Sequence, residues 1–115
     1  MATSQIDSVN PATEEVIRSY EPHSTDEVDR ILDGSAEAFE SWKERPIEER
    51  QMLVQEAGEV LRDRTDEYAE TITHEMGKPV SEARSEVEKC AWVCDYYAEN
   101  AAEHLQKERV GTEPE

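Results

Sequence analysis

The sequence predicts a mainly α fold, with an N-terminal β-hairpin followed by about four helices, the last of them long. Apolar residues recur every three or four positions from Val28 to Leu105, the spacing of one face of a helix. The turn sequence Asn10-Pro11-Ala12-Thr13 separates two short segments that contain Val, Ile and Tyr. Prolines and a glycine stand where helices begin and end. A chain of 115 residues has room for one domain.

Residues 5–20 are predicted to form the hairpin. Proline favours the early position of a turn, and asparagine stabilises turns through its side chain. A lone hairpin is marginally stable in water, so this one is expected to pack on another element.

Residues 25–108 are predicted to be helical. Ser24 or Thr25 is a suitable N-cap for the first helix, and Pro46 ends that helix beside the first turn of the second. The apolar residues of each of these two helices are predicted to share one face: Val28, Ile31, Leu32, Ala36, Phe39 and Trp42 in the first, and Leu53, Ala57, Val60 and Leu61 in the second.

The third helix is predicted to start at the cap Thr65-Asp66-Glu67 and to end at Gly77 in a left-handed conformation, after which Pro79 opens the fourth. Residues 109–115 resemble an interrupted loop. The predicted inward faces are Tyr68, Ala69, Ile72 and Met76, and then Val80, Ala83, Val87, Cys90, Ala91, Cys94, Tyr97, Ala98, Ala101 and Leu105. Many of these side chains are small, so we expect a thin core that another domain completes.

The charge is strongly acidic. Twelve basic and 29 acidic residues leave a net charge of -17, which argues against nucleic acid or an anionic membrane surface as partner. Either the chain is a disordered acidic tail or it is a folded halophilic protein whose repulsion is screened by salt. The helical periodicity favours the folded, halophilic interpretation. Without a signal-peptide pattern or a membrane-spanning stretch, and with two cysteines, the chain is expected to be cytoplasmic.

Cys90 and Cys94 lie one helical turn apart. They are either metal ligands or a redox pair, or two small buried hydrophobic residues. No second pair stands at zinc spacing, and a redox pair has two intervening residues, so the second interpretation is favoured. The three histidines His23, His74 and His104 are scattered and are expected at the surface.

Other candidate groups are few. Trp92, Tyr96 and Tyr97 either line a ligand entrance or serve packing and interfaces, and the latter is the commoner use of aromatic residues. Glu75 is predicted in the last turn of a helix, where the helix dipole disfavours an acid. Lys78 or a bound cation would compensate for it, and the solvated pair with Lys78 is the favoured interpretation. No glycine-rich phosphate loop or nucleophile elbow is found.

Several motifs together resemble the opening stretch of aldehyde dehydrogenases. They are Asn10-Pro11-Ala12-Thr13 with Val16-Ile17, Ala38-Phe39 with Trp42, Glu49-Arg50, Glu75-Met76-Gly77-Lys78-Pro79, Glu82-Ala83-Arg84 and Glu86-Val87. The resemblance runs from about Ile6 to Pro114. Cys90-Ala91-Trp92 and Asp95-Tyr96-Tyr97-Ala98-Glu99 resemble the branch that acts on succinate semialdehyde.

The resemblance implies that residues 1–115 are a partial N-terminal region of the α/β cofactor domain. It implies an NAD- or NADP-dependent parent enzyme that oxidises succinate semialdehyde to succinate. In the family a cysteine thiolate attacks the carbonyl, hydride passes to the nicotinamide, and a glutamate activates water. The resemblance places those residues downstream, so it predicts no catalytic or cofactor-binding residue here and an inactive chain.

The resemblance also implies a candidate cation site. Some family members bind Na⁺ or K⁺ through carbonyls just before the Asn-Pro pair and an acid two residues before the Gly-Lys pair. These positions are Ser8, Val9 and Glu75 here, and oxygen ligands suit such ions. Family members with this site usually have the shorter aspartate at the acid position.

Three hypotheses follow. A fragment of an aldehyde dehydrogenase would expose apolar faces and pack on the remainder of the enzyme or associate with itself. A free-standing acidic helical module that binds a protein partner would instead be monomeric, with few exposed apolar faces. A metal or redox protein acting through Cys90 and Cys94 would bind zinc or form a reversible disulfide.

Overall fold

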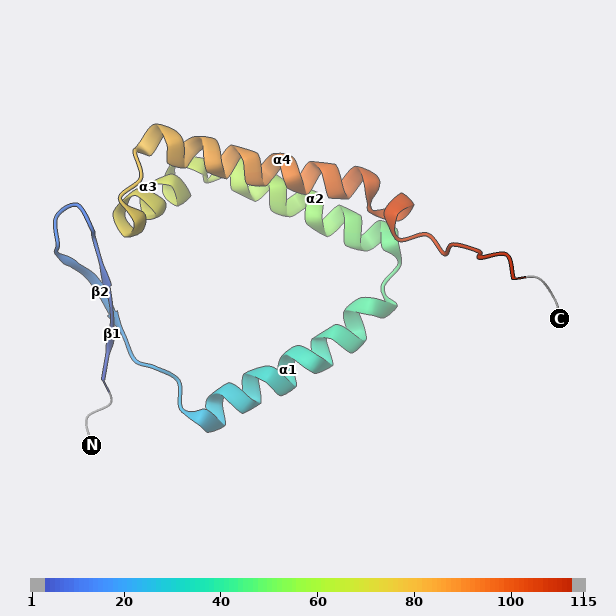
Figure 1. The fold of residues 1–115 in the computed structure, drawn as a ribbon, viewed down its shortest axis with the longest axis horizontal. Coiled ribbons are helices and arrows are strands. Elements are labelled where there is room, and N and C mark those ends of the chain that lie inside the picture. The colour runs from blue at the N-terminus through green and yellow to red at the C-terminus, as the bar shows by residue number, and fades with distance from the viewer. Residues whose placement is uncertain (1–3, 113–115) are drawn as a thin grey trace.

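The computed structural model describes residues 4–112, and its fold is mainly helical, as predicted (Figure 1). In chain order the elements are β1 (Ile6–Val9), β2 (Val16–Tyr20), α1 (Thr25–Glu44), α2 (Ile47–Asp63), α3 (Thr65–Met76) and α4 (Val80–His104). Within the described residues, no helix has the length and apolar character needed to cross a membrane.

The two antiparallel strands are joined by a turn that the side chain of Asn10 stabilises. Its Oδ1 accepts hydrogen bonds from the backbone N–H groups of Ala12 at 2.9 Å and Thr13 at 3.3 Å. Glu14 adopts φ 62° in this turn, a left-handed conformation that is unusual for a residue with a side chain. Backbone hydrogen bonds from Asn10 to Glu15 and from Glu14 to Asn10 hold it there. The predicted hairpin is therefore confirmed.

The packed core lies where α4 runs against α2 and α3. Its buried side chains are Ala69, Ala83, Val87 and Ala91. Because these side chains are small, the helices come close together. At Gly58 of α2 a Cβ atom would lie only 3.0 Å from the Cβ of Cys94 and 3.3 Å from the carbonyl oxygen of Ala91. The core is thin, as the sequence predicts.

Ion pairs at the edge of this core join α4 to both of its neighbours. The guanidinium of Arg62 in α2 binds both carboxylate oxygens of Asp95 in α4. Arg84 in α4 binds Asp66 in the first turn of α3. Hydrogen bonding to Asp95 is the main cause that raises the pKa of Arg62. Exposed pairs of this kind contribute little to stability, so the small buried side chains carry most of the packing.

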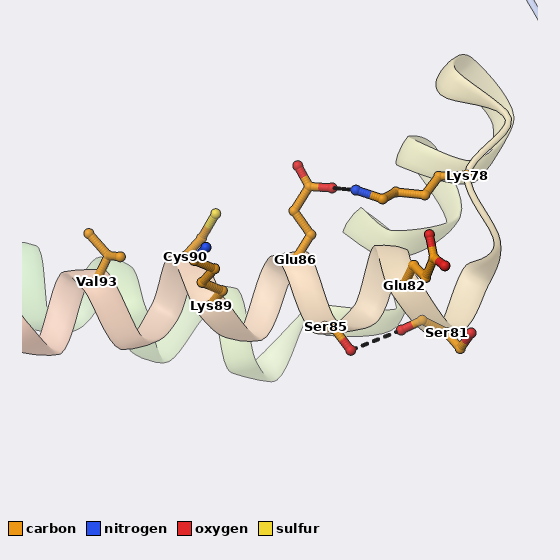
Figure 2. Close-up of a pocket in the computed structure, with 8 residues that line it drawn as sticks. All are labelled: Lys78, Ser81, Glu82, Ser85, Glu86, Lys89, Cys90 and Val93. Atoms are coloured by element: carbon orange, nitrogen blue, oxygen red, sulfur yellow. Dashed lines mark hydrogen bonds and ion pairs between the residues drawn. The ribbon is translucent and has the colours of Figure 1, made fainter.

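The outer face of α4 is bare. A shallow groove of about 860 Å³ runs along it (Figure 2). Its lining residues are Lys78, Ser81, Glu82, Ser85, Glu86, Lys89, Cys90 and Val93. All of them belong to α4 or, in the case of Lys78, to the segment just before it. No lining residue comes from a facing element, so this groove is one face of a helix and does not enclose a ligand.

The corner between α2 and α3 differs from the predicted cap. Thr65 is the first residue of α3, and no side chain caps this helix. The Thr65 hydroxyl instead donates hydrogen bonds to the carbonyls of Leu61 and Arg62, at 3.0 and 2.8 Å. It thus satisfies carbonyl groups that the end of α2 leaves without helical partners. Only Arg64 separates the two helices, so the connection is too short for a separate cap residue.

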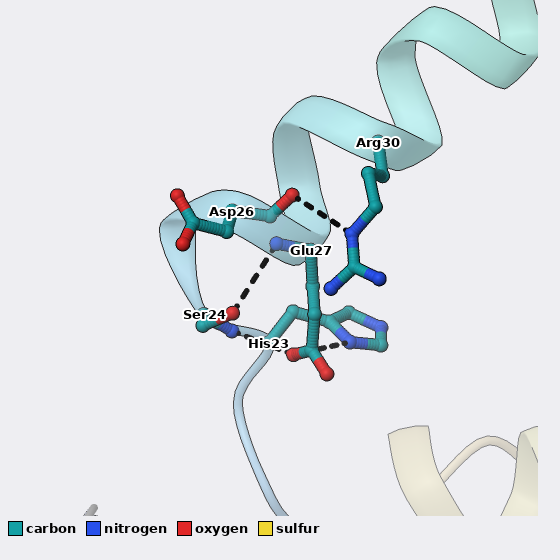
Figure 3. A network of polar contacts seen from close by, with 5 residues as sticks. All are labelled: His23, Ser24, Asp26, Glu27 and Arg30. Carbon is teal, nitrogen blue, oxygen red and sulfur yellow. Dashed lines mark hydrogen bonds and ion pairs between the residues drawn. The ribbon is translucent and has the colours of Figure 1, made fainter.

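Ser24, rather than Thr25, is the N-cap of α1. The Ser24 Oγ accepts the backbone N–H of Glu27 at 3.2 Å, and the Glu27 carboxylate accepts the backbone N–H of Ser24 at 2.8 Å (Figure 3). This capping box satisfies two donors at the helix start. The hydrogen bond from the Ser24 backbone is the main cause that lowers the pKa of Glu27, and His23, with Nδ1 3.6 Å from the carboxylate, lowers it further.

The molecule is open. Its Cα radius of gyration is 20.4 Å, whereas a compact domain of this length has about 13 Å. Its accessible surface is 9859 Å², while a compact monomer of this mass exposes about 6,400 Å². Figure 1 shows the cause: α1 runs apart from the layer of α2, α3 and α4, and the hairpin lies near α3. None of the residues of α1 is buried.

The predicted apolar stripes lie on helix faces, but many are not covered. The whole stripe of α1 is exposed. Elsewhere the exposed residues of these stripes are Ala57, Val60, Met76, Val80, Cys90, Tyr97 and Leu105. The reason is that no described element packs on these surfaces. Exposed apolar faces are what the fragment hypothesis predicts, and the free-standing module, which requires few of them, is not supported.

The end of α4 also differs from the prediction. The helix ends at His104, and residues 106–112 have no helix or strand, although helix was predicted to residue 108. This segment is polar and presents no apolar stripe to pack. Of the predicted loop at 109–115, the last three residues lie outside the described residues.

Candidate functional site

The hairpin meets the helices at the C-terminal end of α3, where the predicted cation ligands lie. The Ser8 hydroxyl of β1 donates a hydrogen bond to Glu75 Oε1 at 3.0 Å. Glu75 stands in the last turn of α3, where backbone carbonyls make an acid unfavourable. A hydroxyl donor at this position offsets part of that cost, because the Ser8 O–H is directed at the carboxylate.

Glu75 is exposed, in agreement with the interpretation as a solvated acid, but the ammonium of Lys78 pairs with another carboxylate. The Lys78 ammonium lies 2.7 Å from Glu86 Oε2. This hydrogen bond is the main cause that raises the pKa of Lys78. Glu86 is one turn further along α4 than Glu82, and Figure 2 shows the lysine chain extended toward it.

Gly77 fixes the corner between α3 and α4. It has φ +72°, and its N–H donates to the Thr73 carbonyl at 3.0 Å, so the predicted left-handed cap is confirmed. A Cβ on Gly77 would lie 3.0 Å from Cγ of Pro11 in the hairpin turn. Glycine is therefore required twice, for its conformation and for the close approach of the hairpin. The contact with Pro11 was not predicted.

The side chains of Ser8 and Glu75 are in contact, whereas the predicted ligand atoms of Ser8 and Val9 are their backbone carbonyls in β1. Carbonyl, hydroxyl and carboxylate oxygens are the donors that hard cations prefer. The donor chemistry of this corner therefore fits K⁺ or Na⁺. Across residues 4–112, no group of three or more His, Cys, Asp or Glu side chains is gathered around a point where a metal could bind.

The two cysteines are both free thiols, but they differ in burial. Cys94 is half-buried against Gly58, in agreement with the interpretation as a packing residue. Cys90 is exposed on the bare face of α4, and the prediction that it is buried is wrong. Residues four apart differ by about 40° around a helix. That rotation is enough to move Cys90 past the edge of the contact with α2.

The aromatic cluster of α4 is also at the surface. The rings of Tyr96 and Tyr97 lie 5.2 Å apart in an edge-to-face arrangement, and the Tyr96 hydroxyl lies 3.0 Å from His104 Nε2. Trp92 is 62% exposed. The rings contact one another at the surface of α4, and their use at an interface stays a prediction. His23, His74 and His104 all lie at the surface, as predicted.

A family profile described as "Aldehyde dehydrogenase family" matches residues 1–115. This chain belongs to the aldehyde dehydrogenase family. The sequence motifs from Asn10 to Glu99 therefore identify the family correctly. The match covers the hairpin, all the described helices and the hairpin–α3 corner.

Similar aldehyde dehydrogenases include several named for succinate semialdehyde. The chain is 40% identical to the "Probable succinate-semialdehyde dehydrogenase" with NADP(+) specificity in its name from Synechocystis sp., over 94% of this chain and 24% of that protein. It is 40% identical to the succinate semialdehyde dehydrogenase Sad of Escherichia coli, over 88% of this chain and 22% of that protein.

The fold of the chain matches the N-terminal part of solved aldehyde dehydrogenases. The crystal structure of succinic semialdehyde dehydrogenase from Streptococcus pyogenes with NADP+ superposes with a TM-score of 0.85 at 31% identity. The match covers 92% of this chain and 24% of that one. The chain thus spans about a quarter of the length of the relatives it matches, and the predicted fold class is confirmed.

The glycines of this chain do not form a glycine-rich phosphate loop. Four glycines are dispersed through the sequence. A Cβ at Gly34 or Gly111 would meet nothing within 4 Å, Gly58 packs between helices, and Gly77 caps α3. None belongs to a phosphate-binding loop. No step of aldehyde oxidation is therefore assigned to a side chain of this segment.

Gly58 and Pro11 are the positions important to the fold that sequence analysis missed. An isolated glycine within a helical pattern signals a packing reason, and Gly58 carries that signal. The approach of Pro11 to Gly77 leaves no trace in local sequence, because the two residues are far apart in the chain.

Proposed function

We propose that this chain is the N-terminal region of an aldehyde dehydrogenase that oxidises succinate semialdehyde to succinate with NADP or NAD. The support is its similarity, over most of its length, to relatives that bear this name, with NADP(+) or NAD(P)+ as printed specificity. The reading frame beyond Glu115 provides the test. We expect it to encode a nucleotide-binding fold and a reactive cysteine, and the product to prefer succinate semialdehyde over glyceraldehyde. An encoded enzyme that prefers glyceraldehyde would contradict the proposed substrate, succinate semialdehyde.

We propose further that the chain alone is inactive. The two thiols are part of a helix, with Cys94 half-buried and Cys90 over a groove that only α4 and Lys78 line. Neither stands beside a group arranged as a general base or an oxyanion site. The purified chain should form no reduced nicotinamide from succinate semialdehyde with NADP or NAD. Turnover by the purified chain that disappears in Cys90→Ser or Cys94→Ala would overturn this proposal.

The partner proposed for the exposed apolar faces is the remainder of an aldehyde dehydrogenase, or a second copy of this chain. One such face lies on α1, where Ile31, Leu32 and Phe39 are between 54% and 61% exposed. Sedimentation should show self-association that weakens after Phe39→Ser. Glu37→Ser, a change on the same helix at an acidic position, serves as the control. A strictly monomeric chain at high concentration would count against self-association.

The corner of Ser8, Val9 and Glu75 is proposed to bind K⁺ or Na⁺. A hydrogen bond brings the Glu75 carboxylate beside Ser8 in β1, and carboxylate and carbonyl oxygens suit these ions. The chain should melt at a higher temperature in K⁺ than in a bulky organic cation at equal ionic strength. Glu75→Ala should abolish the difference and Glu67→Ala should preserve it. Equal melting temperatures for the unmodified chain in the two salts would exclude the site.

A halophilic origin is proposed from the net charge of -17, and a cytoplasmic one from the two free cysteines. Repulsion among the acidic groups should fall as salt screens them. The melting temperature is expected to rise steadily with KCl up to molar concentration. A chain that is most stable in dilute buffer would contradict this origin.

A further inference from the structure

The hairpin is not held in place by α1, the element that follows it in sequence. β2 is followed by α1, none of whose residues is buried. α1 leads to α2 through Arg45, in extended conformation, and Pro46. Figure 1 shows the chain returning from α2 through α3 to the side of the hairpin. The hairpin is therefore positioned by what it contacts at the end of α3.

Two contacts are made at this point. One is the hydrogen bond from the Ser8 hydroxyl to Glu75, between residues 67 positions apart. The other is the approach of the Pro11 ring to Gly77, where any Cβ would come within 3.0 Å. The polar contact holds β1 and the apolar contact holds the hairpin turn. Both hold the hairpin to the C-terminal end of α3.

The rest of the seam between the hairpin and α3 is hollow. A groove of about 340 Å³ is lined by Ile17, Arg18, Tyr20, Thr71, His74 and Glu75. A second, of about 240 Å³, is lined by residues of the hairpin turn and β2 with His74. Ile17 remains 43% exposed beside these grooves, so the seam is only partly packed and depends on the two contacts.

We propose that the Ser8–Glu75 hydrogen bond and the Pro11–Gly77 contact form a latch that closes the chain into a ring. With the latch closed, β1 and β2 are held against α3. With it open, the hairpin and α1 swing together about the Arg45–Pro46 turn, because no residue of α1 is buried. The helices α2, α3 and α4 keep their packing in both states, since their buried residues do not include any latch residue.

Hydrogen exchange of the strand amides tests the latch, because a hairpin without a packing partner is marginally stable in water. The experiment uses the whole chain in a bulky organic cation, so that no small cation bridges the same oxygens. Ser8→Ala and Glu75→Ala should each accelerate exchange in β1 and β2 by about tenfold. Exchange in α4 should not change, and the double variant should add little to either single one.

Matched variants separate the latch from general destabilisation. Ser8→Thr keeps the hydroxyl and Glu75→Gln keeps an acceptor, so both should retain slow strand exchange. Glu70→Ala, earlier on α3, should also leave it slow. Gly77→Ala should open the hairpin by driving a methyl group into Pro11. Unchanged strand exchange in Ser8→Ala and Glu75→Ala would overturn the latch, and so would equal acceleration in α4.

The result is independent of the proposed enzyme and of the proposed cation. If Ser8→Ala and Glu75→Ala accelerate strand exchange in the organic cation while K⁺ does not raise the melting temperature, the latch is supported and the cation site is excluded. If strand exchange is slow only in K⁺, the cation site is supported and the latch is excluded.

Discussion

α1 and α4 are both long amphipathic helices, yet one is bare and the other is half covered. The apolar stripe of α1 contains large residues, including Ile31, Phe39 and Trp42, and all of it is exposed. The covered face of α4 contains Ala83, Val87 and Ala91, which are buried against α2 and α3. Small side chains let helix backbones approach without another layer, whereas large ones need a deep complementary surface. Amphipathicity thus marks the face on which a helix can pack, and the size of the side chains indicates how closely another backbone can approach it.

The difference in burial between α1 and α4 is tested most strongly by placing the same charge on both helices. Ala91→Asp introduces an unpaired carboxylate where the native side chain is 0% exposed, and it should destabilise the core by more than about 4 kcal/mol. Ala36→Asp is the matched change on the exposed stripe of α1, and it should change stability by less than about 0.5 kcal/mol. Urea denaturation of both variants measures this. Equal losses would mean that α1 packs on the core in solution.

The two helical glycines allow a subtler comparison. Gly58→Ala puts a Cβ at 3.0 Å from Cys94 Cβ and 3.3 Å from a backbone oxygen, and overpacking of this kind costs about 1–3 kcal/mol. Gly34 in α1 has nothing within 4 Å, so Gly34→Ala should only gain helix propensity, about 0.5–1 kcal/mol locally. Thermal melting of the core and the exchange rates of α1 amides distinguish the two. A stabilising Gly58→Ala would show that α2 and α4 are further apart than described.

The cap of α1 should matter more to that helix than to the molecule. Ser24→Ala removes the acceptor for the Glu27 N–H, and loss of an N-cap costs about 1 kcal/mol of helix stability. Because α1 has no buried residue, we expect faster exchange in its first turns and no change in the urea midpoint of the core. Ser24→Asp, which keeps an acceptor, should restore slow exchange. A shift of the core midpoint in Ser24→Ala would indicate coupling between the two regions.

The smallest expected effect is the pH dependence of the same cap. The folded pKa of Glu27 lies below its ordinary value of 4.5. A lowered folded pKa stabilises the folded form above the unfolded pKa, and that contribution is lost as pH falls through the folded value. The α1 amides should therefore exchange faster in acid below about pH 4.5, when corrected for intrinsic rates. Glu27→Gln should flatten this response, and a response of unchanged size in that variant would assign it to another group.

Local signals predicted the elements of this fold, and distant contacts escaped prediction. Ser24, Pro46, Gly77 and Pro79 act through their own backbone or nearest neighbours, so their roles at helix ends follow from sequence. Whether a helix face is covered depends on segments elsewhere, and the buried assignment of Cys90 failed for that reason.

The candidate site shows the same division. Ser8 and Glu75 were placed together by resemblance to a family, and the structure brings their side chains into contact. No periodicity or spacing links positions so far apart. The same holds for the Lys78–Glu86 pair, which competes with the nearer Glu75 and prevails. Only the positions of all the helices decide which acid a flexible lysine reaches.

Among residues 4–112, the buried residues all belong to α2, α3 and α4, a continuous stretch from Ile47 to His104 joined by two short corners. Interactions between elements that follow one another in sequence form quickly, because little chain entropy is lost in closing short loops. This stretch is therefore able to assemble on the ribosome before any later segment is synthesised. The large apolar side chains of α1 would then stay exposed while this stretch is already folded. In that interval the nascent chain would be most open to aggregation and to binding by chaperones.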